Sequence, residues 1–337
     1  MTDMRIIRLA AEPTLDNLAV TRAPVPVPGP GEVLLRLRAS SLNFHDYLVV
    51  AGYIPVMEGR IPLSDGAGEI AALGEGVSGW SVGDRVMGAF FPLWIDGAPD
   101  RANNARISGE TADGFAADYV VAPATSLTAI PERWSFAEAA TLPCAALTAW
   151  RVLVEEGKLQ PGDSVVLPGS GGLCLFALQI ARARDLTVWS TTSTAAKAER
   201  LRAMGADHVV NYRADAQWGE TIRAATGGEG VDLVLEIGGQ SSFHQSVRAT
   251  RMGGQVIVVG TTANGPPDLP LTDIIMRHIH VDGIAVGSVG QLRALTAFLA
   301  ERDIRPVIDR EFPLEQLAAA FRYQLTGGHF GKIVISF

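Results

Sequence analysis

The chain has 337 residues, a formal net charge of −8 at pH 7 and two cysteines, and 47% of its residues are hydrophobic. This composition argues against disorder and is sufficient for two domains with their own cores. The acidic balance, without any block of Lys or Arg, argues against nucleic acid or an anionic membrane as a partner. No apolar run reaches the roughly 20 residues that span a bilayer, and the first residues do not form a signal peptide, so we expect a cytoplasmic enzyme.

Residues 1 to about 128 predict a β-rich region. A proline-rich entry at residues 24–30 precedes an alternating strand, in which Val33, Leu35 and Leu37 share one face. Short segments punctuated by glycine follow over residues 66–90 and also predict strands.

From about residue 129 to residue 287 strands alternate with helices, which indicates parallel βαβ units and an α/β fold. The nearly continuous apolar runs are typical of parallel strands covered on both faces. The expected strands are Ser164–Leu167, Thr187–Ser190, His208–Asn211, Val231–Ile237, Gln255–Gly260 and Val281–Val286. Beyond residue 288 we expect two amphipathic helices and a closing strand, "GKIVISF".

The segment "SVVLPGSGGLCLFALQIARARD", residues 164–185, carries a glycine cluster between a predicted strand and a predicted helix. Gly169 permits the tight turn, and Gly171 and Gly172 allow a pyrophosphate to approach the backbone at the helix N-terminus. Cys174 stands where a third glycine is often found, and we expect it to be a small buried side chain. The pattern predicts a dinucleotide site; the alternative is a purely structural turn.

The following segment predicts which dinucleotide binds. Folds that prefer NAD carry an acidic residue about 20 residues further on, for the ribose 2′-hydroxyl. No carboxylate occurs between Asp185 and Glu199, where the chain has hydroxyl side chains from Ser190 to Thr194 and then Lys197. Hydroxyl donors and a cation favour a 2′-phosphate, so the sequence predicts NADPH. The alternative is an ordinary capped helix start with an exposed lysine.

Over nearly its whole length the chain resembles the medium-chain dehydrogenase/reductase superfamily. The segments that carry the resemblance include "PVPVPGPGEVLLRLRASSLNFHD", "SDGAGEIAALGEGVSGWSVGDRV", "LPCAALTAW", "GSGGLCLFALQIAR", "AMGADHVVNYR" and "GGHFGKIVISF". The resemblance implies a GroES-like β-rich catalytic domain, residues 1–128 plus 288–337, around an inserted Rossmann domain with a doubly wound parallel sheet, residues 129–287. It also implies a cleft between the domains for the nicotinamide and, often, a homodimer formed through the last strands of the cofactor sheet.

The resemblance raises the question of zinc. At the positions of the catalytic-metal motifs, Asn43 replaces the ligand cysteine, Ser64 a histidine and Asp65 a glutamate, while Cys144 alone retains a ligand-type side chain. The four-cysteine structural lobe is also missing, and catalytic zinc needs about three suitable ligands. A metal role for His45 with Asp46 is disfavoured because neighbours on a strand point to opposite faces. We therefore expect no metal and a resemblance to the zinc-independent branch, the quinone oxidoreductases and their enone and enoyl reductase relatives.

Within that branch the resemblance implies catalytic and substrate-side roles for a few side chains. Asn43 would orient the nicotinamide or the substrate oxygen, and Tyr53 and Ser64 would offer hydroxyls to that oxygen. Phe91 and Trp94 would form an aromatic wall for a flat acceptor. Three of them have an alternative role: Asn43 as a turn or capping residue, and Tyr53 and Trp94 as packing or loop residues. Asp46, next to His45, is expected to brace the domain.

The resemblance also implies cofactor contacts along the chain. They involve Asn43, Thr148, Gly169, Gly171, Gly172, Leu173, Thr192, Ser193, Lys197, Tyr212, Gly238, Gly260, Ile284, Ala285, Val286, Gly331 and Lys332. The pocket's shape is expected to depend on the loops at residues 90–114 and 261–270.

The predicted function is hydride transfer from NADPH to a conjugated carbonyl compound, such as a quinone, an enone or an enoyl substrate. Without a metal, a charge that spreads into an enolate or hydroquinone anion is easier to stabilise than a localised alkoxide. The alternatives are an alcohol dehydrogenase or carbonyl reductase of the same superfamily, and a non-catalytic, crystallin-like protein that binds NADPH.

Overall fold

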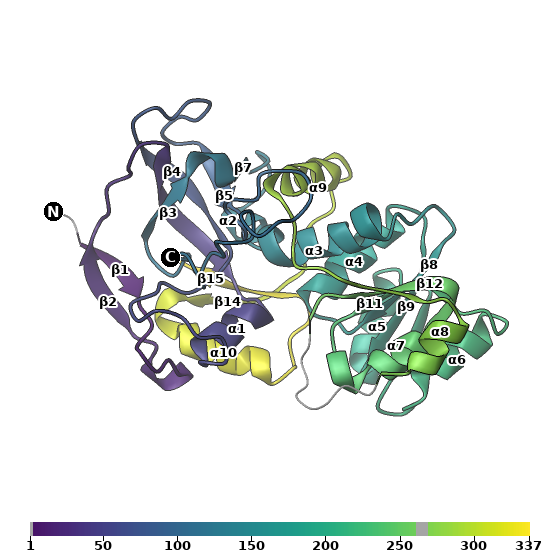
Figure 1. Cartoon of the computed structure of the whole chain (residues 1–337). Coiled ribbons are helices and arrows are strands. Elements are labelled where there is room, and N and C mark those ends of the chain that lie inside the picture. The colour runs from purple at the N-terminus through teal and green to yellow at the C-terminus, as the bar shows by residue number, and fades with distance from the viewer. Residues whose placement is uncertain (1–2, 261–268) are drawn as a thin grey trace. The chain divides into compact units, whose positions relative to one another are not determined.

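The computed structural model describes residues 3–260 and 269–337 (Figure 1). Most of the loop expected at residues 261–270 to shape the pocket lies outside the described residues. The chain forms two compact units, residues 1–147 with 287–337 (unit 1) and residues 148–286 (unit 2). The sequence had suggested a boundary at residue 128, but residues 129–147 pack on unit 1. In that segment Ile130 N–H donates to Arg85 O at 2.9 Å, and Arg305 donates to Arg133 O at 3.0 Å.

Unit 1 is built on a seven-stranded sheet that joins the two ends of the chain. Its central strand, β3 (Glu32–Ser41), pairs antiparallel with β4 (Gly66–Leu73), β6 (Tyr119–Pro123) and β15 (Lys332–Ser336). β5 (Arg85–Gly88) and β7 (Leu127–Ala129) extend the sheet beyond β4, and β14 (Ile308–Pro313) lies parallel to β15 at the opposite edge. The alternation of apolar side chains in β3 thus buries Val33, Leu35 and Leu37, as the sequence predicted.

Short elements surround this sheet in unit 1. β1 (Asp3–Ile7) and β2 (Val20–Pro24) form a separate antiparallel pair. The helices are α1 (Phe44–Val50), α2 (Phe136–Ala139), α9 (Val289–Glu301) and α10 (Leu317–Leu325), and α3 (Leu147–Trp150) begins at the last residue before unit 2. A buried core that includes Ile6, Leu35, Leu127, Phe321 and Ile335 contains side chains from both ends of the chain.

Unit 2 contains six parallel strands in the order β10-β9-β8-β11-β12-β13. This is the order 3-2-1-4-5-6 of a doubly wound Rossmann sheet, which confirms the predicted fold class. The strands are β8 (Ser164–Pro168), β9 (Thr187–Thr192), β10 (His208–Asn211), β11 (Val231–Glu236), β12 (Thr250–Val258) and β13 (His280–Gly283). The helices are α4 (Gly172–Arg182), α5 (Ala195–Ala203), α6 (Trp218–Ala225), α7 (Phe243–Ala249) and α8 (Leu271–Met276).

Two expected strands of unit 2 have different ends in the structure. β12 begins at Thr250, not at Gln255, so the strand includes two glycines, Gly253 and Gly254, that break the apolar pattern. β13 ends at Gly283, whereas the sequence predicted strand up to Val286. Val286 has a φ of +44°, which extended backbone does not permit, so residues 284–286 leave the sheet.

Close packing of α6 on α7 in unit 2 requires a glycine at position 219. A Cβ atom on Gly219 would lie 2.1 Å from the backbone oxygen of Gln245, and backbone cannot move as freely as a side-chain tip. We expect Gly219→Ala to lower the free energy of unfolding by roughly 2 kcal/mol, although alanine is intrinsically the better helix former. Gly283→Ala is the matched control, because a Cβ there meets no atom within 4 Å. Chemical denaturation that finds both variants equally stable would contradict this view of the packing.

Candidate active site

The candidate active site is a cluster of buried polar side chains in unit 1. Its members are Asn43, Ser64, Asp65 and Lys332, which are 8%, 0%, 0% and 3% exposed. Residues so distant in sequence meet because β15 pairs with the end of β3, with Val334 opposite Ser41. Asn43 follows β3, Ser64 and Asp65 precede β4, and Lys332 is the first residue of β15.

The side chain of Asn43 connects the other three members of the cluster. Its Nδ2 donates to Ser64 Oγ at 3.1 Å and to Asp65 Oδ2 at 2.9 Å. Its Oδ1 accepts a hydrogen bond from Lys332 Nζ at 2.6 Å. Both amide protons are thus engaged inside unit 1, which makes Asn43 a connector of this network. The structure also places Asn43 at the N-cap position of α1. Asn43 is therefore a capping residue as well, which was the alternative role expected from the sequence.

Asp46 braces this arrangement from the first turn of α1. Its Oδ2 accepts the Asn43 backbone N–H at 2.9 Å, and its Oδ1 accepts the Ser64 backbone N–H at 2.8 Å. One carboxylate, 1% exposed, thus ties the start of the helix to the segment that precedes β4. This geometry agrees with the bracing role expected for Asp46.

Asp65 and Lys332 form the charged pair of the cluster. Lys332 Nζ lies 3.6 Å from Asp65 Oδ2 and donates to Leu42 O at 2.8 Å. Burial raises the pKa of Asp65 to about 6, even though the Lys332 ammonium acts in the opposite direction. Burial also raises the pKa of the Cys144 thiol well above its ordinary value, and the negative charge of Asp65 adds to that shift. At the ordinary pH of the cell Cys144 is therefore a thiol.

The side chains of this cluster do not suit a catalytic zinc ion. Zinc binds thiolate, imidazole or carboxylate, whereas this cluster offers one carboxylate, an amide and a hydroxyl, and Cys144, whose pKa responds to Asp65, is a protonated thiol. The ammonium of Lys332 lies beside the single carboxylate and would repel a second cation. Over residues 3–260 and 269–337, no three His, Cys, Asp or Glu side chains are arranged to hold a metal. These side chains do not fit a zinc ion because too few of them are zinc ligands and because Lys332 places a positive charge among them.

The other predicted catalytic and substrate-side residues do not join this cluster. Tyr53 is 64% exposed in the turn after α1, with its ring 6.0 Å from that of Tyr47. Phe91 and Trp94 are 3% and 1% exposed, their ring centroids are 5.9 Å apart, and Trp94 Nε1 donates to Gly97 O. Neighbouring side chains cover both aromatic rings in this structure, as they also cover Ser64, and the role of the two rings toward a flat acceptor stays a prediction.

His45 has a different environment from the one expected. It lies on helix α1, not on a strand, so it and Asp46 do not point to opposite faces of a sheet. His45 Nε2 lies 2.7 Å from Glu110 Oε2, a partner 65 residues away that no sequence motif indicated. Burial alone would lower the pKa of His45, but the carboxylates of Asp46 and Glu110 outweigh it and raise the pKa to about 9.

In unit 2 the glycine loop has the geometry of an anion site. Gly169 has a φ of +105°, and a Cβ there would meet only the tip of Ile237, at 3.9 Å, so the space beside the turn is open. Gly171 is the N-cap of α4, whose first residues are Gly172 and Leu173, so unpaired backbone N–H groups are available there. Cys174 is buried as expected, and its Sγ lies 3.0 Å from Pro168 O. These residues fit a dinucleotide pyrophosphate.

The end of β9 provides hydroxyl groups beside this loop. In the described part of the chain, Ser190 Oγ and Thr192 Oγ1 are buried and lack hydrogen-bond partners. Unpaired buried donors are costly unless a ligand engages them, so both fit a ribose or phosphate group. Thr194 Oγ1 accepts the Lys197 backbone N–H at 3.3 Å and so caps α5. The capped helix start, which was the alternative expected from the sequence, is therefore also present. Tyr212, on the neighbouring loop, is 42% exposed.

Glu236 is a functional candidate that the sequence analysis missed. It is fully buried at the carboxyl end of β11, and its Oε1 accepts from Gly238 N–H at 2.6 Å, Gly239 N–H at 2.8 Å and Ser242 Oγ at 2.6 Å. Its Oε2 accepts from Ser246 Oγ. Glu236 therefore fixes the loop that holds Gly238. A carboxylate at the end of an apolar strand, "VDLVLEI", was the available signal.

The remaining predicted cofactor residues occupy separate places. Thr148 is buried at the start of unit 2, and Gly260 follows β12. Of the segment 284–286, Ala285 O accepts a hydrogen bond from Arg151 at 3.1 Å. Gly331 and Lys332 belong to unit 1, where Lys332 serves the polar cluster described above. The structure thus gives Lys332 partners that the sequence analysis did not anticipate.

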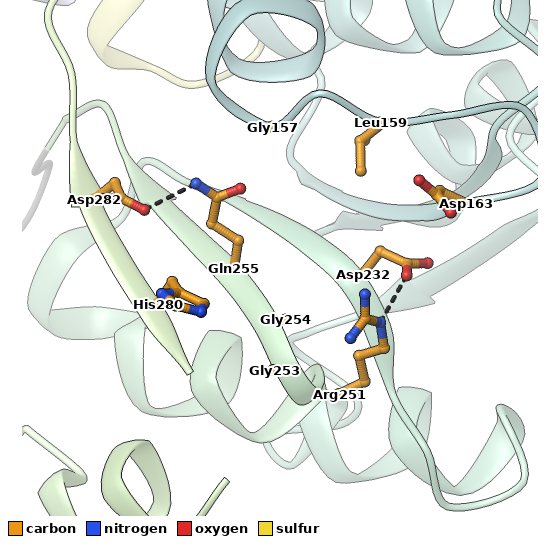
Figure 2. A pocket seen from close by; sticks show the side chains of 10 residues that line it. All are labelled: Gly157, Leu159, Asp163, Asp232, Arg251, Gly253, Gly254, Gln255, His280 and Asp282. Atoms are coloured by element: carbon orange, nitrogen blue, oxygen red, sulfur yellow. Dashed lines mark hydrogen bonds and ion pairs between the residues drawn. The ribbon is translucent and has the colours of Figure 1, made fainter. Parts of the chain in front are cut away.

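Figure 2 shows a polar cavity of about 280 Å³ whose lining includes Asp163, Asp232 and His280. Asp163 precedes β8, and Asp232 and His280 stand at the starts of β11 and β13, so the cavity lies at the amino ends of the strands, whereas the glycine loop follows the carboxyl end of β8. Near the amino end of β11, Asp232 accepts from Ser164 N–H and Arg251 Nε, each at 2.7 Å. Burial would raise the pKa of Asp232, but these hydrogen bonds hold it below its ordinary value. Gln255 donates to Asp282 at 2.8 Å on the other side of the cavity. These contacts join neighbouring strands, and the cavity is separate from the cofactor loop.

The His45 ion pair predicts a specific pH dependence of stability. The pKa of His45 is raised from 6.5 to about 9 in the folded state, so the stabilisation is complete below pH 6.5 and is lost as pH rises through about 9. We expect wild type to lose roughly 2 kcal/mol relative to His45→Gln between pH 6.5 and 9.5. Denaturant titrations at several pH values measure this difference. Glu110→Gln should remove part of this pH-dependent difference in stability. If the stability of wild type and of His45→Gln changes equally with pH, the raised pKa of His45 is contradicted.

No helix in the described part of the chain is both long and apolar enough to cross a bilayer.

Comparison with known proteins places the chain in a family. Residues 29–132 match the family described as "Alcohol dehydrogenase GroES-like domain", and residues 172–301 match "Zinc-binding dehydrogenase". A zinc-type alcohol dehydrogenase-like protein of Schizosaccharomyces pombe is 39% identical over 91% of both chains. The crystal structure of a protein from Sinorhizobium meliloti 1021, described as an alcohol dehydrogenase, matches with a TM-score of 0.92 and 35% sequence identity over the whole of both chains. The crystal structure of an NAD-dependent alcohol dehydrogenase matches with a TM-score of 0.92 and 32% sequence identity, over 99% of this chain and 100% of the other. The chain therefore belongs to the medium-chain dehydrogenase/reductase superfamily, as an alcohol dehydrogenase-like oxidoreductase.

Proposed function

We propose that this protein is a zinc-independent, NADPH-dependent oxidoreductase that reduces a conjugated carbonyl compound. The observation that carries the proposal is the charge pattern of the polar cluster. Its cation is the ammonium of Lys332, 2.6 Å from Asn43 Oδ1 and 3.6 Å from Asp65 Oδ2, where a zinc-dependent enzyme would need a set of metal ligands. The family binds a nicotinamide cofactor, and the glycine loop of unit 2 fits one.

The choice of acceptor follows from where negative charge develops. A nicotinamide cofactor, when bound in its reduced form, supplies a hydride. Reduction of a simple ketone leaves the whole charge on one oxygen, which a metal ion or a strong acid must stabilise. In a quinone or an α,β-unsaturated carbonyl the charge is delocalised, so hydrogen bonds are sufficient and water can supply the proton. The cluster in unit 1 provides hydrogen bonds and one fixed positive charge.

The preference for NADPH rests on the end of β9. Ser190 and Thr192 present buried hydroxyls without partners in the described chain, and no carboxylate follows until Glu199. Lys197, half-buried in the first turn of α5, adds a positive charge. One structural relative is described as NAD-dependent, which makes the cofactor preference a direct test.

We also infer a homodimer from the resemblance. β13 is the edge strand of the six-stranded sheet and is exposed along its whole length. An edge strand that pairs with a second copy of the chain would be exposed in this way in a single copy.

The cofactor preference is tested by Lys197→Glu. A carboxylate at this position would repel a 2′-phosphate and accept a hydrogen bond from a 2′-hydroxyl. We expect wild type to bind NADPH at least about 10-fold more tightly than NADH, and Lys197→Glu to reverse the order. Dissociation constants from fluorescence titration provide the measurement. Lys197→Gln is the matched control, which should lose the preference without reversing it; tighter NADH binding by wild type would refute the assignment.

The substrate class is tested with purified protein and NADPH. We expect the loss of absorbance at 340 nm to be fastest with quinones, enones or enoyl thioesters, and at least about 100-fold slower with saturated aldehydes and ketones that match them in size. The names of the relatives favour a second candidate, oxidation of simple alcohols. Robust turnover of NADP⁺ with unconjugated primary or secondary alcohols would support that candidate. Binding of NADPH without any turnover would support a non-catalytic role.

A further inference from the structure

Lys332 carries an ammonium into the interior of unit 1. Its side chain is 3% exposed, and lysine is almost never buried unless it has partners. The backbone fixes its position on both sides: Lys332 N–H donates to Val307 O at 2.8 Å, and Leu42 N–H donates to Ile333 O at 2.9 Å. At the preceding residue, Gly331, φ is +106° and a Cβ would lie 2.3 Å from Val307 O. The fold therefore imposes the position of this charge.

The ammonium determines which way the Asn43 carboxamide faces. An ammonium only donates hydrogen bonds, so the Asn43 atom 2.6 Å from Lys332 Nζ must be the oxygen. The amide nitrogen consequently faces Ser64 Oγ and Asp65 Oδ2. A reversed carboxamide would place N–H against N–H at Lys332 and oxygen against oxygen at Asp65.

The hydrogen bonds run in one direction from Lys332 to Ser64. Ser64 Oγ accepts from Asn43, and no acceptor for the Ser64 hydroxyl proton is found among residues 3–260 and 269–337. Asp65 Oδ1 is likewise buried without a partner in these ranges. A hydroxyl at the end of a chain that begins with a cation is polarised, and such donors stabilise developing oxyanions.

We infer that Lys332 is a positioning residue that takes the electrostatic place of a metal ion and acts through Asn43 to hold Ser64 as the hydrogen-bond donor to the substrate oxygen. This inference rests on the proposed function for the nature of the substrate. Ser64 donates a hydrogen bond and keeps its proton, while water protonates the reduced product. Lys332 acts only through Asn43 and Asp65.

A double-mutant cycle tests the coupling. Lys332→Met and Ser64→Ala should each lower kcat about 30- to 100-fold, and the double variant should lose no more than about threefold beyond either single variant. Lys332→Arg should recover part of the loss, and the Kd for NADPH should stay within about twofold throughout. If the fall in kcat of the double variant equals the product of the two single falls, the two residues act independently and the inference is overturned. So would a loss of NADPH affinity in Lys332→Met as large as its loss of kcat, because that would make Lys332 a cofactor-binding residue.

A second variant covers the case in which Lys332→Met does not fold. Asn43→Asp keeps an acceptor for the ammonium but removes the donor to Ser64, so it should lower kcat as much as Ser64→Ala. A kcat within threefold of wild type would overturn the inference.

A metal-binding measurement is independent of activity. Lys332→Met removes a repelling charge but adds no ligand, so equilibrium dialysis with Zn²⁺ should show weak binding that is about 10-fold tighter than to wild type, and Cys144→Ser in the same background should abolish the gain. Wild-type binding as tight as that of Lys332→Met and dependent on Cys144 would overturn the inference. If simple alcohols prove to be the substrates, the proposed substrate class fails, and the same cycle measured with those alcohols still decides the role of Lys332.

Discussion

The interior of unit 1 depends on the neutralisation of one buried ammonium. Lys332 is surrounded by the oxygens of Leu42, Asn43 and Asp65. Asp65 Oδ2 also accepts from Ser41 Oγ and Asn43 Nδ2. A buried charge without such partners would cost several kcal/mol. The Lys332 ammonium also fixes the orientation of the Asn43 carboxamide. Burial raises the pKa of Asp65 to about 6, and the ammonium limits that rise because it favours the ionised carboxylate.

Much of the fold could be predicted because its signals are local. The apolar runs of unit 2 gave the six strands, and the glycine loop marked the turn between β8 and α4. The ends of strands were less certain, since the bend at Val286 depends on a left-handed backbone that no residue type announces. The boundary between the units was placed too early because contacts such as Ile130 with Arg85 join segments far apart in sequence.

The site was predictable only in part, for a related reason. Asn43 and Ser64 were singled out by their motif positions, and the structure brings them within 3.1 Å. Their connection to Lys332 depends on the pairing of β15 with β3, which joins residues nearly 300 positions apart and leaves no periodic signal. Glu110 as partner of His45 is hidden in the same way. Phe91 and Trp94 are buried, as large aromatic side chains commonly are, and their expected place beside a flat acceptor stays a prediction.

A tethered ammonium and a metal ion are not equivalent, and the difference bears on the chemistry. Both supply positive charge to a site with little water, but only a metal has open coordination positions that a substrate oxygen can enter directly. The Lys332 ammonium is committed to Leu42 and Asn43, so in the proposed mechanism its charge acts on a substrate only through hydrogen-bonded neighbours and is weakened by each step and by Asp65. A site of this kind stabilises a diffuse negative charge better than a concentrated one. The geometry of one lysine thus links the donor set, which does not suit zinc, to the proposed kind of acceptor, one that delocalises its electrons.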